Sequence, residues 1–244
     1  MSKNLSVVIP VYNAQDILKQ SFNQLIKVLE TLKLDYEVLF RNDGSTDESR
    51  HILEAMAKQN TNVHIAFNDG NDGLGLTLRR LFEDADGDYI VYCDCDFPYG
   101  VAIIPEIVRE LKGSEIVVAS RYRGIRSRIP LSRWIVSRGY HIFCRWLFNI
   151  PVIDIGSGSV GLRKEVLAAV DLGCAGFGIH AELFVKAARK GISIKEIPAQ
   201  AYFSNAGSFR ILKHGPNIIR ETVQLWGELV TSEKENKEVV RIGS

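Results

Sequence analysis

The feature that most constrains this chain is the alternation, over its first half, of short apolar runs with longer amphipathic segments. The short runs are rich in β-branched and aromatic residues and are bounded by turn residues, which predicts strands at Leu5–Ile9, Tyr36–Phe40, Val63–Phe67, Tyr89–Cys93 and Ile116–Ala119. The spacing of apolar residues predicts helices at Ile17–Leu32, Thr46–Lys58, Leu74–Asp84 and Pro105–Leu111. Such alternation predicts an α/β domain with a mostly parallel sheet flanked by helices, with binding sites at the carboxyl ends of the strands.

Length and composition limit the classes of protein that remain. The 244 residues are 46% hydrophobic, which suits one domain over 1–232 and a short flexible tail over 233–244. The net charge of +1 is not the large positive charge that is typical of nucleic-acid-binding proteins. No apolar run is long enough to span a bilayer. Four cysteines without a CxxC pair favour a reducing, cytoplasmic location. The second half is less regular, with predicted helices near Ala181–Lys190 and Asn217–Val230.

Two turns that follow predicted strands are rich in polar residues. Pro10-Val-Tyr-Asn13 follows the first strand, and Asp43-Gly-Ser-Thr-Asp47 follows the second. Ser, Thr and Asp often cap a helix by accepting hydrogen bonds from its free N–H groups, so the second turn has a structural and a ligand-binding interpretation. The first turn lacks Gly-x-Gly-x-x-Gly, which argues against a dinucleotide-binding domain.

The fourth predicted strand ends in two carboxylates, Asp94 and Asp96. Strand alternation would place both on one side, where two anions repel each other unless a cation lies between them. A hard divalent ion that bridges carboxylates and substrate phosphates meets that requirement. The alternative is a strand end with two solvated acids. Cys93 and Cys95 would point to the other side, where we expect them to be core residues and not metal ligands.

Taken together, these motifs resemble the family-2 glycosyltransferases in order and spacing. The resemblance spans roughly residues 5–215 and is strongest toward the polyprenyl-phosphate branch, which includes the dolichol-phosphate mannose synthases. The residues that carry it are Pro10-Val-Tyr-Asn13, Asn42-Asp-Gly-Ser-Thr-Asp47, Asn71-Asp-Gly73, Asp94-Cys-Asp96, Ser120-Arg-Tyr122, Arg133-Trp-Ile-Val-Ser137, Asp154-Ile-Gly-Ser-Gly158 and Leu162-Arg-Lys-Glu-Val166.

The resemblance implies a GT-A fold, a nucleoside-diphosphate sugar donor, Mg²⁺ or Mn²⁺, and inversion at the anomeric carbon. Asp94 and Asp96 would hold the metal and the diphosphate, and with Asp154 they form the expected catalytic set. Guanidinium groups bind phosphate bidentately, which suits the acceptor-phosphate residues that the resemblance implies, Arg121 and Arg133 together with Ser137. The implied donor-binding residues are Pro10, Tyr12, Asn13, Asp43, Gly73 and Arg210.

Two departures from the family pattern bear on activity. Where the family often has a Gln that assists the metal, this chain has Pro98, which offers no side-chain ligand. Near the C-terminus the branch carries an Arg-x-x-Gly-x-Ser-Lys type loop, whereas this chain reads Ser204-Asn-Ala-Gly-Ser-Phe-Arg210. Diphosphate clamping would then fall to Arg210, Lys213 or His214, or would be lost.

The class of acceptor decides what catalysis requires. A lipid phosphate has a second pKa of about 6, so it is largely dianionic and already nucleophilic at neutral pH. A sugar or protein hydroxyl would instead need a general base, for which Asp154 and Glu182 are the candidates. The main hypothesis is therefore transfer to a polyprenyl phosphate such as dolichyl or undecaprenyl phosphate. The alternatives are a hydroxyl acceptor, or a degenerate member that binds nucleotide sugar without turnover.

The segment Ser132–Phe148 combines aromatic residues with Arg133, Arg138 and Arg145. An amphipathic helix of this composition suits a membrane surface, although the same pattern also makes an ordinary docking helix. With a polyprenyl substrate, the hypothesis is peripheral binding at the cytoplasmic face of a membrane.

Overall fold

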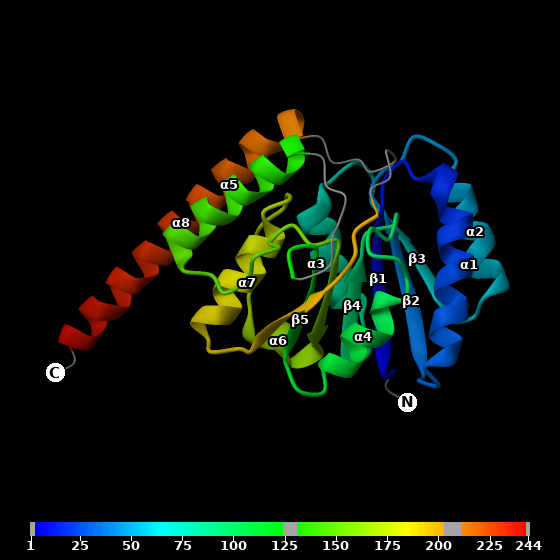
Figure 1. Ribbon diagram of the computed structural model, residues 1–244, viewed down its shortest axis with the longest axis horizontal. Helices are drawn as coiled ribbons and strands as arrows, with labels where there is room; N and C mark the ends of the chain where they lie inside the picture. Colours follow the sequence, from blue (N-terminus) through cyan, green and yellow to red (C-terminus); the bar gives the residue numbers. More distant parts are fainter. Residues whose placement is uncertain (1–2, 124–130, 203–210, 243–244) are drawn as a thin grey trace.

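The computed structural model describes residues 3–123, 131–202 and 211–242, with side chains described outside 131–133, 211–214 and 232–242. The elements alternate along the chain, and Figure 1 shows a central sheet with helices on both of its faces. The strands are β1 (Leu5–Val11), β2 (Tyr36–Asn42), β3 (Val63–Phe67), β4 (Tyr89–Cys93), β5 (Ile116–Ser120), β6 (Ser159–Arg163) and β7 (Ile194–Pro198). The helices are α1 (Gln15–Thr31), α2 (Ser49–Gln59), α3 (Leu74–Asp84), α4 (Ile103–Glu110), α5 (Leu131–Phe148), α6 (Lys164–Ala169), α7 (Ile179–Arg189) and α8 (Ile211–Ile242).

The sheet has the strand order β3-β2-β1-β4-β6-β5-β7, in which β6 alone runs antiparallel to its neighbours. From β1 the chain moves outward to β2 and β3 and then returns to place β4 on the other side of β1. Connections that diverge in this way leave a crevice at the carboxyl ends of the two strands, where ligands of α/β proteins usually bind. The crevice expected here lies between the ends of β1 and β4.

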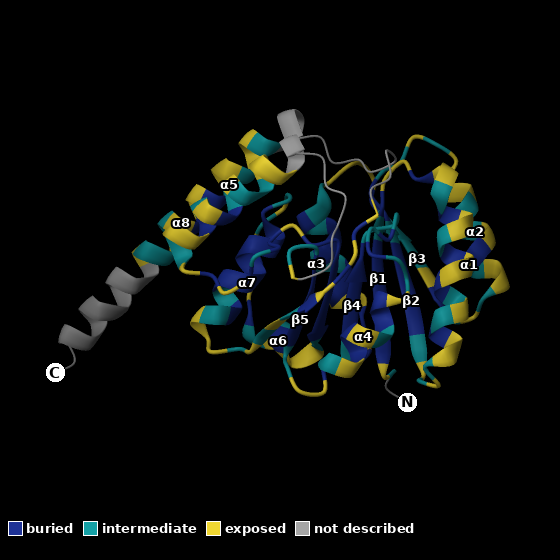
Figure 2. Cartoon of the chain, in the orientation of Figure 1, coloured by how far each residue is buried: buried dark blue, intermediate teal, exposed yellow. Residues whose placement is uncertain are grey.

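Two apolar cores cover the two faces of the sheet. One core packs α1, α2 and α4 against side chains such as Val7, Ile9 and Val91, and the other packs α3, α6 and α7 against Val8, Ile90 and Tyr92. Central strands that are buried on both faces read as continuous apolar runs, as β1 does. Strands β1 and β4 are mostly buried (Figure 2), so side chains that contact a ligand are expected at the ends of these strands.

The sequence prediction of an α/β domain with a mostly parallel sheet is confirmed, and the five predicted strands all occur. Strands β6 and β7 were not predicted. Helix α8 continues to Ile242, so the expected boundary at residue 232 does not coincide with the end of an element. The flexibility of residues 233–244 stays a prediction. Within the described residues, no helix is both long enough and apolar enough to cross a bilayer.

Candidate functional site

The carboxyl ends of β2, β1 and β4 lie side by side, because β1 pairs in parallel with both neighbours. This edge brings together Tyr12 and Asn13 after β1, Asp43 after β2, and Asp94 after β4. In Figure 1 these strand ends lie on the upper side of the sheet, where α5 also begins. Residues predicted from separate motifs therefore share one edge.

The turn after β1 is held by the polar turn after β2. The backbone N–H of Asn13 donates to Ser45 Oγ at 2.9 Å, and the Asn13 side-chain oxygen accepts from the Thr46 N–H at 2.9 Å. The N–H of Gln15 donates to Asp47 at 3.1 Å. Although burial opposes it, hydrogen bonds from Ser49 and backbone N–H groups lower the pKa of Asp47. The turn after β2 therefore binds the start of α1 through Asp47, whereas the N-cap residue of α2, Glu48, makes no side-chain capping hydrogen bond.

Asp43 is buried, with 5% of its surface exposed, and its carboxylate organises the loop before α3. One oxygen accepts from the Asn68 amide and from the Asp72 N–H, both at 2.8 Å, and the other accepts from the Gly73 N–H at 3.1 Å. Gly73 has a φ of 90°, which a side chain would strain. The Asp43 carboxylate therefore shapes the loop that holds Gly73, which the sequence alone did not indicate. Pro10 is half-buried on β1, and Tyr12 is exposed.

The carboxylates at the end of β4 lie in a turn and not in the strand. Strand β4 ends at Cys93, and the Phe97 N–H donates to the Asp94 carbonyl at 3.0 Å. The strand-alternation argument for Asp94 and Asp96 is therefore wrong for Asp96, because the backbone leaves the extended conformation before it. Both residues are half-buried and lie at the same edge of the sheet, beside the crevice between β1 and β4.

The cysteines around Asp94 belong to the core, as predicted. Cys93 is fully buried, and Cys95 packs against the core formed with α1, α2 and α4. Burial raises the pKa of Cys93 to about 12 and also raises the pKa of Cys95 well above its usual value. Both shifts favour the protonated thiol, which agrees with a place in the core.

A second cluster lies at the carboxyl end of β5, which β6 separates from β4 in the sheet. The Asp154 carboxylate is 1% exposed, and its Oδ2 accepts from Tyr99 Oη at 3.0 Å and from the backbone and Nε of Arg121 at 3.0 and 2.8 Å. Arg121 also donates to the Gly156 carbonyl at 2.7 Å. Asp154 Oδ1 has no hydrogen-bond partner within the described part of the chain. The pair fixes the Arg121 guanidinium beside the predicted catalytic edge.

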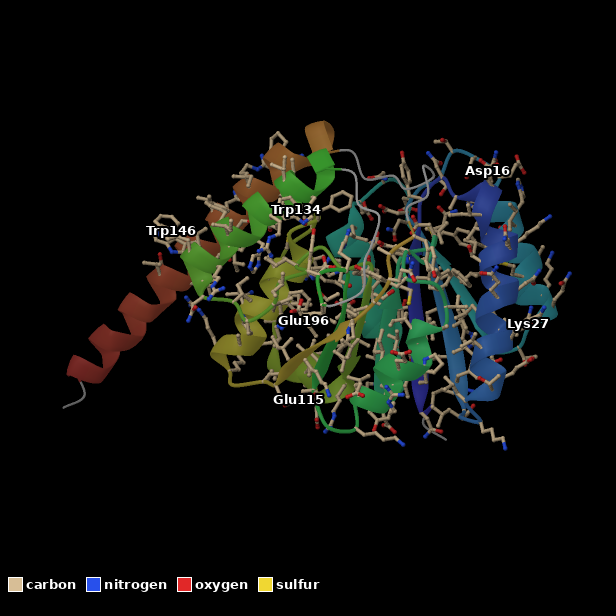
Figure 3. The ribbon with its side chains drawn as sticks, in the orientation of Figure 1. Asp16, Lys27, Glu115, Trp134, Trp146 and Glu196 are labelled. Atoms are coloured by element: carbon tan, nitrogen blue, oxygen red, sulfur yellow. The ribbon has the colours of Figure 1, made fainter. Side chains whose placement is uncertain are left out.

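Glu196 supports this cluster from β7 (Figure 3). Its side chain is 2% exposed, and one oxygen accepts from the N–H groups of Ile153 and Asp154 at 3.0 and 2.9 Å. The other oxygen accepts from Arg123 Nε at 2.9 Å. Sequence reasoning missed Glu196, because the contacts join residues more than forty positions apart and no local motif marks them.

Ser137 is engaged by the protein itself. Tyr122 Oη donates to Ser137 Oγ at 2.7 Å, which joins the end of β5 to α5. The guanidinium groups of Arg121 and Arg138 each lie 5.9 Å from the Tyr122 ring centre. Of the three predicted acceptor-phosphate residues, Arg121 and Ser137 are thus connected through Tyr122. The Arg133 side chain and all of Arg210 lie outside the described residues.

One buried group, Glu182, differs from its expected role, whereas His180 does not. Glu182, expected to be a solvated helix residue or a weak candidate base, is 4% exposed and accepts from the Gly173 and Cys174 N–H groups at 2.9 and 2.8 Å. It also forms an ion pair with Lys186 at 2.7 Å. His180 is buried as a structural residue, and burial lowers its pKa to about 4, so its ring is neutral.

Comparison with known proteins places this fold in a defined class. Solved structures of glucosyl-3-phosphoglycerate synthase from Mycobacterium tuberculosis superpose with a TM-score of 0.71 at 18% identity, covering 92% of this chain and 81% of that one. A second structure, in complex with Mn²⁺, UDP and glucosyl-3-phosphoglycerate, gives a TM-score of 0.69 at 18% identity, covering 91% and 78%. At this identity the likeness shows the fold, which is the GT-A type of α/β domain.

Sequence comparison gives the family. The family model for glycosyl transferase family 2 matches residues 6–170, which is most of the chain, and the chain therefore belongs to that family. A dolichol-phosphate mannosyltransferase from Pyrococcus furiosus is 30% identical over 201 residues, covering 80% of this chain and 55% of that protein. A protein of the same name from Saccharomyces cerevisiae is 28% identical over 193 residues, covering 76% and 72%. The chain thus spans only about half the length of the Pyrococcus relative.

Proposed function

We propose that this glycosyltransferase moves a sugar from a nucleoside-diphosphate sugar to a polyprenyl phosphate, with inversion at the anomeric carbon. The observation that carries the proposal is the pairing of two sites on one sheet edge. Asp94 and Asp96 lie at the crevice between β1 and β4, and the buried Asp154 holds Arg121 at the carboxyl end of β5, beyond β6 on the same edge of the sheet. Relatives named dolichol-phosphate mannosyltransferases support the choice of acceptor.

The carboxylates at the end of β4 fit a Mg²⁺ or Mn²⁺ ion. Within the described residues no cluster of three or more His, Cys, Asp or Glu side chains could hold a metal alone. Mg²⁺ is usually bound by one or two carboxylates together with substrate phosphates, which matches Asp94 and Asp96 with Pro98 in place of a third ligand. Such an ion would neutralise the charge of the departing diphosphate. Structural neighbours that contain Mn²⁺ or Mg²⁺ with UDP support this assignment.

The donor would lie along the ends of β2, β1 and β4. Tyr12 is exposed at this edge and could cover the base, and the loop shaped by Asp43 closes the far side at Gly73. Asn13 is held in a left-handed conformation, with φ of 49°, by the turn after β2. Pro10 fixes the strand that leads into this turn. Arg210 is proposed to contact the diphosphate from the chain's C-terminal part.

The acceptor half of the reaction needs positioning more than proton transfer. In the proposed step, a phosphate oxygen attacks the anomeric carbon while the bond from that carbon to the diphosphate breaks. The attacking phosphate is already dianionic, so no proton has to be removed. Arg121, Arg133 and Ser137 would hold it in line, and holding reactants in that geometry is a large part of catalysis.

The geometry around Asp154 favours this acceptor over a hydroxyl. A general base must reach the proton that it removes. Asp154 Oδ2 instead accepts three hydrogen bonds from Arg121 and Tyr99, one of which is the ion pair with Arg121, and Asp154 Oδ1 is buried as well, with the residue 1% exposed. Glu182 is bound to backbone N–H groups of the 173–174 loop. We therefore assign Asp154 as a residue that positions Arg121, and neither carboxylate is placed as the base that a hydroxyl acceptor would need.

We expect Arg133→Ala to lower sugar transfer by at least about tenfold while donor affinity is unchanged, because a charge-assisted hydrogen bond contributes about 1.5–3 kcal/mol. Transfer kinetics and calorimetric titration of the nucleoside diphosphate would be measured side by side. Arg109→Ala, at an exposed ion pair on the opposite side of the sheet, is the control. Equal losses of transfer and of donor affinity in Arg133→Ala would assign this arginine to the donor site or to the fold.

We further propose that the α5–α8 pair binds the surface of the membrane that carries the acceptor, at its cytoplasmic face. The two helices contact each other, with Tyr140 Oη 2.9 Å from Thr222 Oγ1. Figure 3 shows Trp134 and Trp146 toward the two ends of α5, and 80% of Trp146 is exposed. The pair carries several other exposed apolar side chains: Ile135, Val136, Ile142, Ile219, Val223 and Trp226. Arg138, Arg145 and Arg220 add cations to the same helices.

The protein should therefore bind anionic liposomes reversibly, and added salt should weaken the binding. Each basic residue near an anionic surface contributes about 1 kcal/mol, which is screened beyond about 8 Å at physiological ionic strength. Flotation of the protein with anionic vesicles, with and without added salt, would measure the binding and its salt dependence. Trp146→Glu should reduce binding, whereas Gln20→Glu, which makes the same charge change on exposed α1, should not. Protein that stays soluble at low salt with excess anionic vesicles would contradict the membrane proposal.

A further inference from the structure

Tyr92 lies on β4, two residues before the carboxylates, and only 1% of it is exposed. Its hydroxyl donates a hydrogen bond to Asp94 Oδ1. The ring is held in place by His180, whose ring centre lies 5.0 Å away at an interplanar angle of 33°. His180 in turn stacks on Phe184 of α7 at 6.5 Å. The core packed against α7 therefore fixes the direction from which the phenol reaches Asp94.

The other oxygen of Asp94 is limited by Gly158, which precedes β6. A methyl group at Gly158 would overlap Asp94 Oδ2 and would lie 2.7 Å from Pro98 Cγ. The Asp94 N–H donates to the Gly158 carbonyl at 2.9 Å, so the two backbones are joined at this point. The carboxylate is thus held from one side by a hydroxyl and closely approached on the other by a residue without a side chain.

This arrangement matters because few ligands are available at the edge. Pro98 replaces the side chain that could have been a third ligand, and the described residues contain no larger acidic or histidine cluster. The orientation of each remaining carboxylate then has more influence on affinity. Groups that hydrogen-bond to metal ligands orient them, and losing such a group typically weakens metal binding by about 10–100-fold.

We propose that Tyr92 and Gly158 are positioning residues that hold Asp94 in the orientation that binds the divalent metal. The inference rests on the proposed metal-dependent function. Neither residue touches substrate in this account, and each acts through Asp94. The simpler interpretation is that Tyr92 is a buried phenol that needs a hydrogen-bond partner and takes the nearest one. The two interpretations differ in what the loss of the hydroxyl does to metal affinity.

The test is Tyr92→Phe, which removes only the hydroxyl. Tyr140→Phe is the matched control, because Tyr140 Oη also bonds to a side chain, Thr222 Oγ1, but on the α5–α8 pair. Binding of Mn²⁺ alone would be followed by the electron paramagnetic resonance signal of the free ion, and binding of UDP and GDP with Mn²⁺ by calorimetry. Thermal unfolding of each variant would report stability separately.

We expect Tyr92→Phe to weaken Mn²⁺ binding by about tenfold or more, and Tyr140→Phe to leave it unchanged at a similar cost in melting temperature. Gly158→Ala should weaken Mn²⁺ binding further, because the methyl group displaces Asp94 directly. Wild-type affinity for Mn²⁺ in Tyr92→Phe would overturn the inference and leave the proposed function intact. If the wild-type protein itself binds neither Mn²⁺ nor a nucleoside diphosphate, the proposed function fails and the inference fails with it.

Discussion

Replacing Asp96 by alanine should abolish Mn²⁺-dependent binding of a nucleoside diphosphate while the protein remains folded. Asp96 follows the end of β4 in a half-buried turn, so its loss removes a proposed metal ligand without opening the core. Losing a group that only supports a ligand costs about 10–100-fold in affinity, and losing the ligand should cost at least about 100-fold. Calorimetric titration of the nucleoside diphosphate with and without Mn²⁺ measures the effect.

Asp88→Ala is the matched control for this prediction. Asp88 is an exposed carboxylate at the opposite end of the same strand, so its removal makes the same change in charge far from the crevice. The control should bind as the wild type does. Unchanged Mn²⁺-dependent affinity in Asp96→Ala would remove the metal assignment, and a large loss of melting temperature would instead give Asp96 a structural role.

Arg121→Met should destabilise the protein by about 3–5 kcal/mol, because it leaves the Asp154 carboxylate buried without its cation. Among the contacts of the described residues, Asp154 would keep the bonds from Tyr99 and from the backbone N–H at position 121. In a chain of this size, such a loss lowers the melting temperature by roughly 6–20 °C. Transfer should also fall, since Arg121 is a proposed ligand of the acceptor phosphate. Thermal unfolding and transfer kinetics measure the two effects.

A double substitution measures the interaction between Arg121 and Asp154 apart from the other effects of each single change. Arg121→Met with Asp154→Asn removes both charges, and the combined loss of stability should be smaller than the sum of the two single losses. Arg109→Met, at the exposed pair with Glu110, should cost no more than about 1 kcal/mol. Additive losses in the double variant would show that the two side chains do not depend on each other.

The sequence predicted the parallel part of the sheet well, because β1, β2 and β4 are largely buried and each contains a run of consecutive apolar residues, at 7–9, 38–40 and 89–93. Strand β6 was missed for a physical reason. Its centre is Gly161, where a methyl group would overlap Ile107 and lie 3.0 Å from Leu111 of the neighbouring helical segment. Helix packing therefore requires a residue that weakens the strand pattern. Strand β7 lies at the edge of the sheet, and the charged residues Lys195 and Glu196 interrupt its apolar pattern.

The site was predicted as a set of motifs but not as a set of contacts. Spacing placed Asp43, Asp94 and Arg121 after strands, and the structure brings those strand ends to one edge. The spacing of the motifs could not indicate that Asp43 binds the loop at Gly73 or that Asp154 pairs with Arg121, because these contacts join positions about thirty residues apart. The connections between strands determine which residues far apart in the sequence come into contact, and the patterns in a single sequence do not encode those contacts.

The measurement that tests the central proposal most directly is sugar transfer by the purified protein to a polyprenyl phosphate in detergent. A panel of nucleoside-diphosphate sugars would be supplied with Mn²⁺, and the anomeric configuration of the product would be determined by NMR. We expect one sugar to be transferred to the phosphate, with the configuration opposite to that of the donor, and no product with Asp96→Ala. Transfer only to sugar or protein hydroxyls, or a product that retains the donor's configuration, would contradict it.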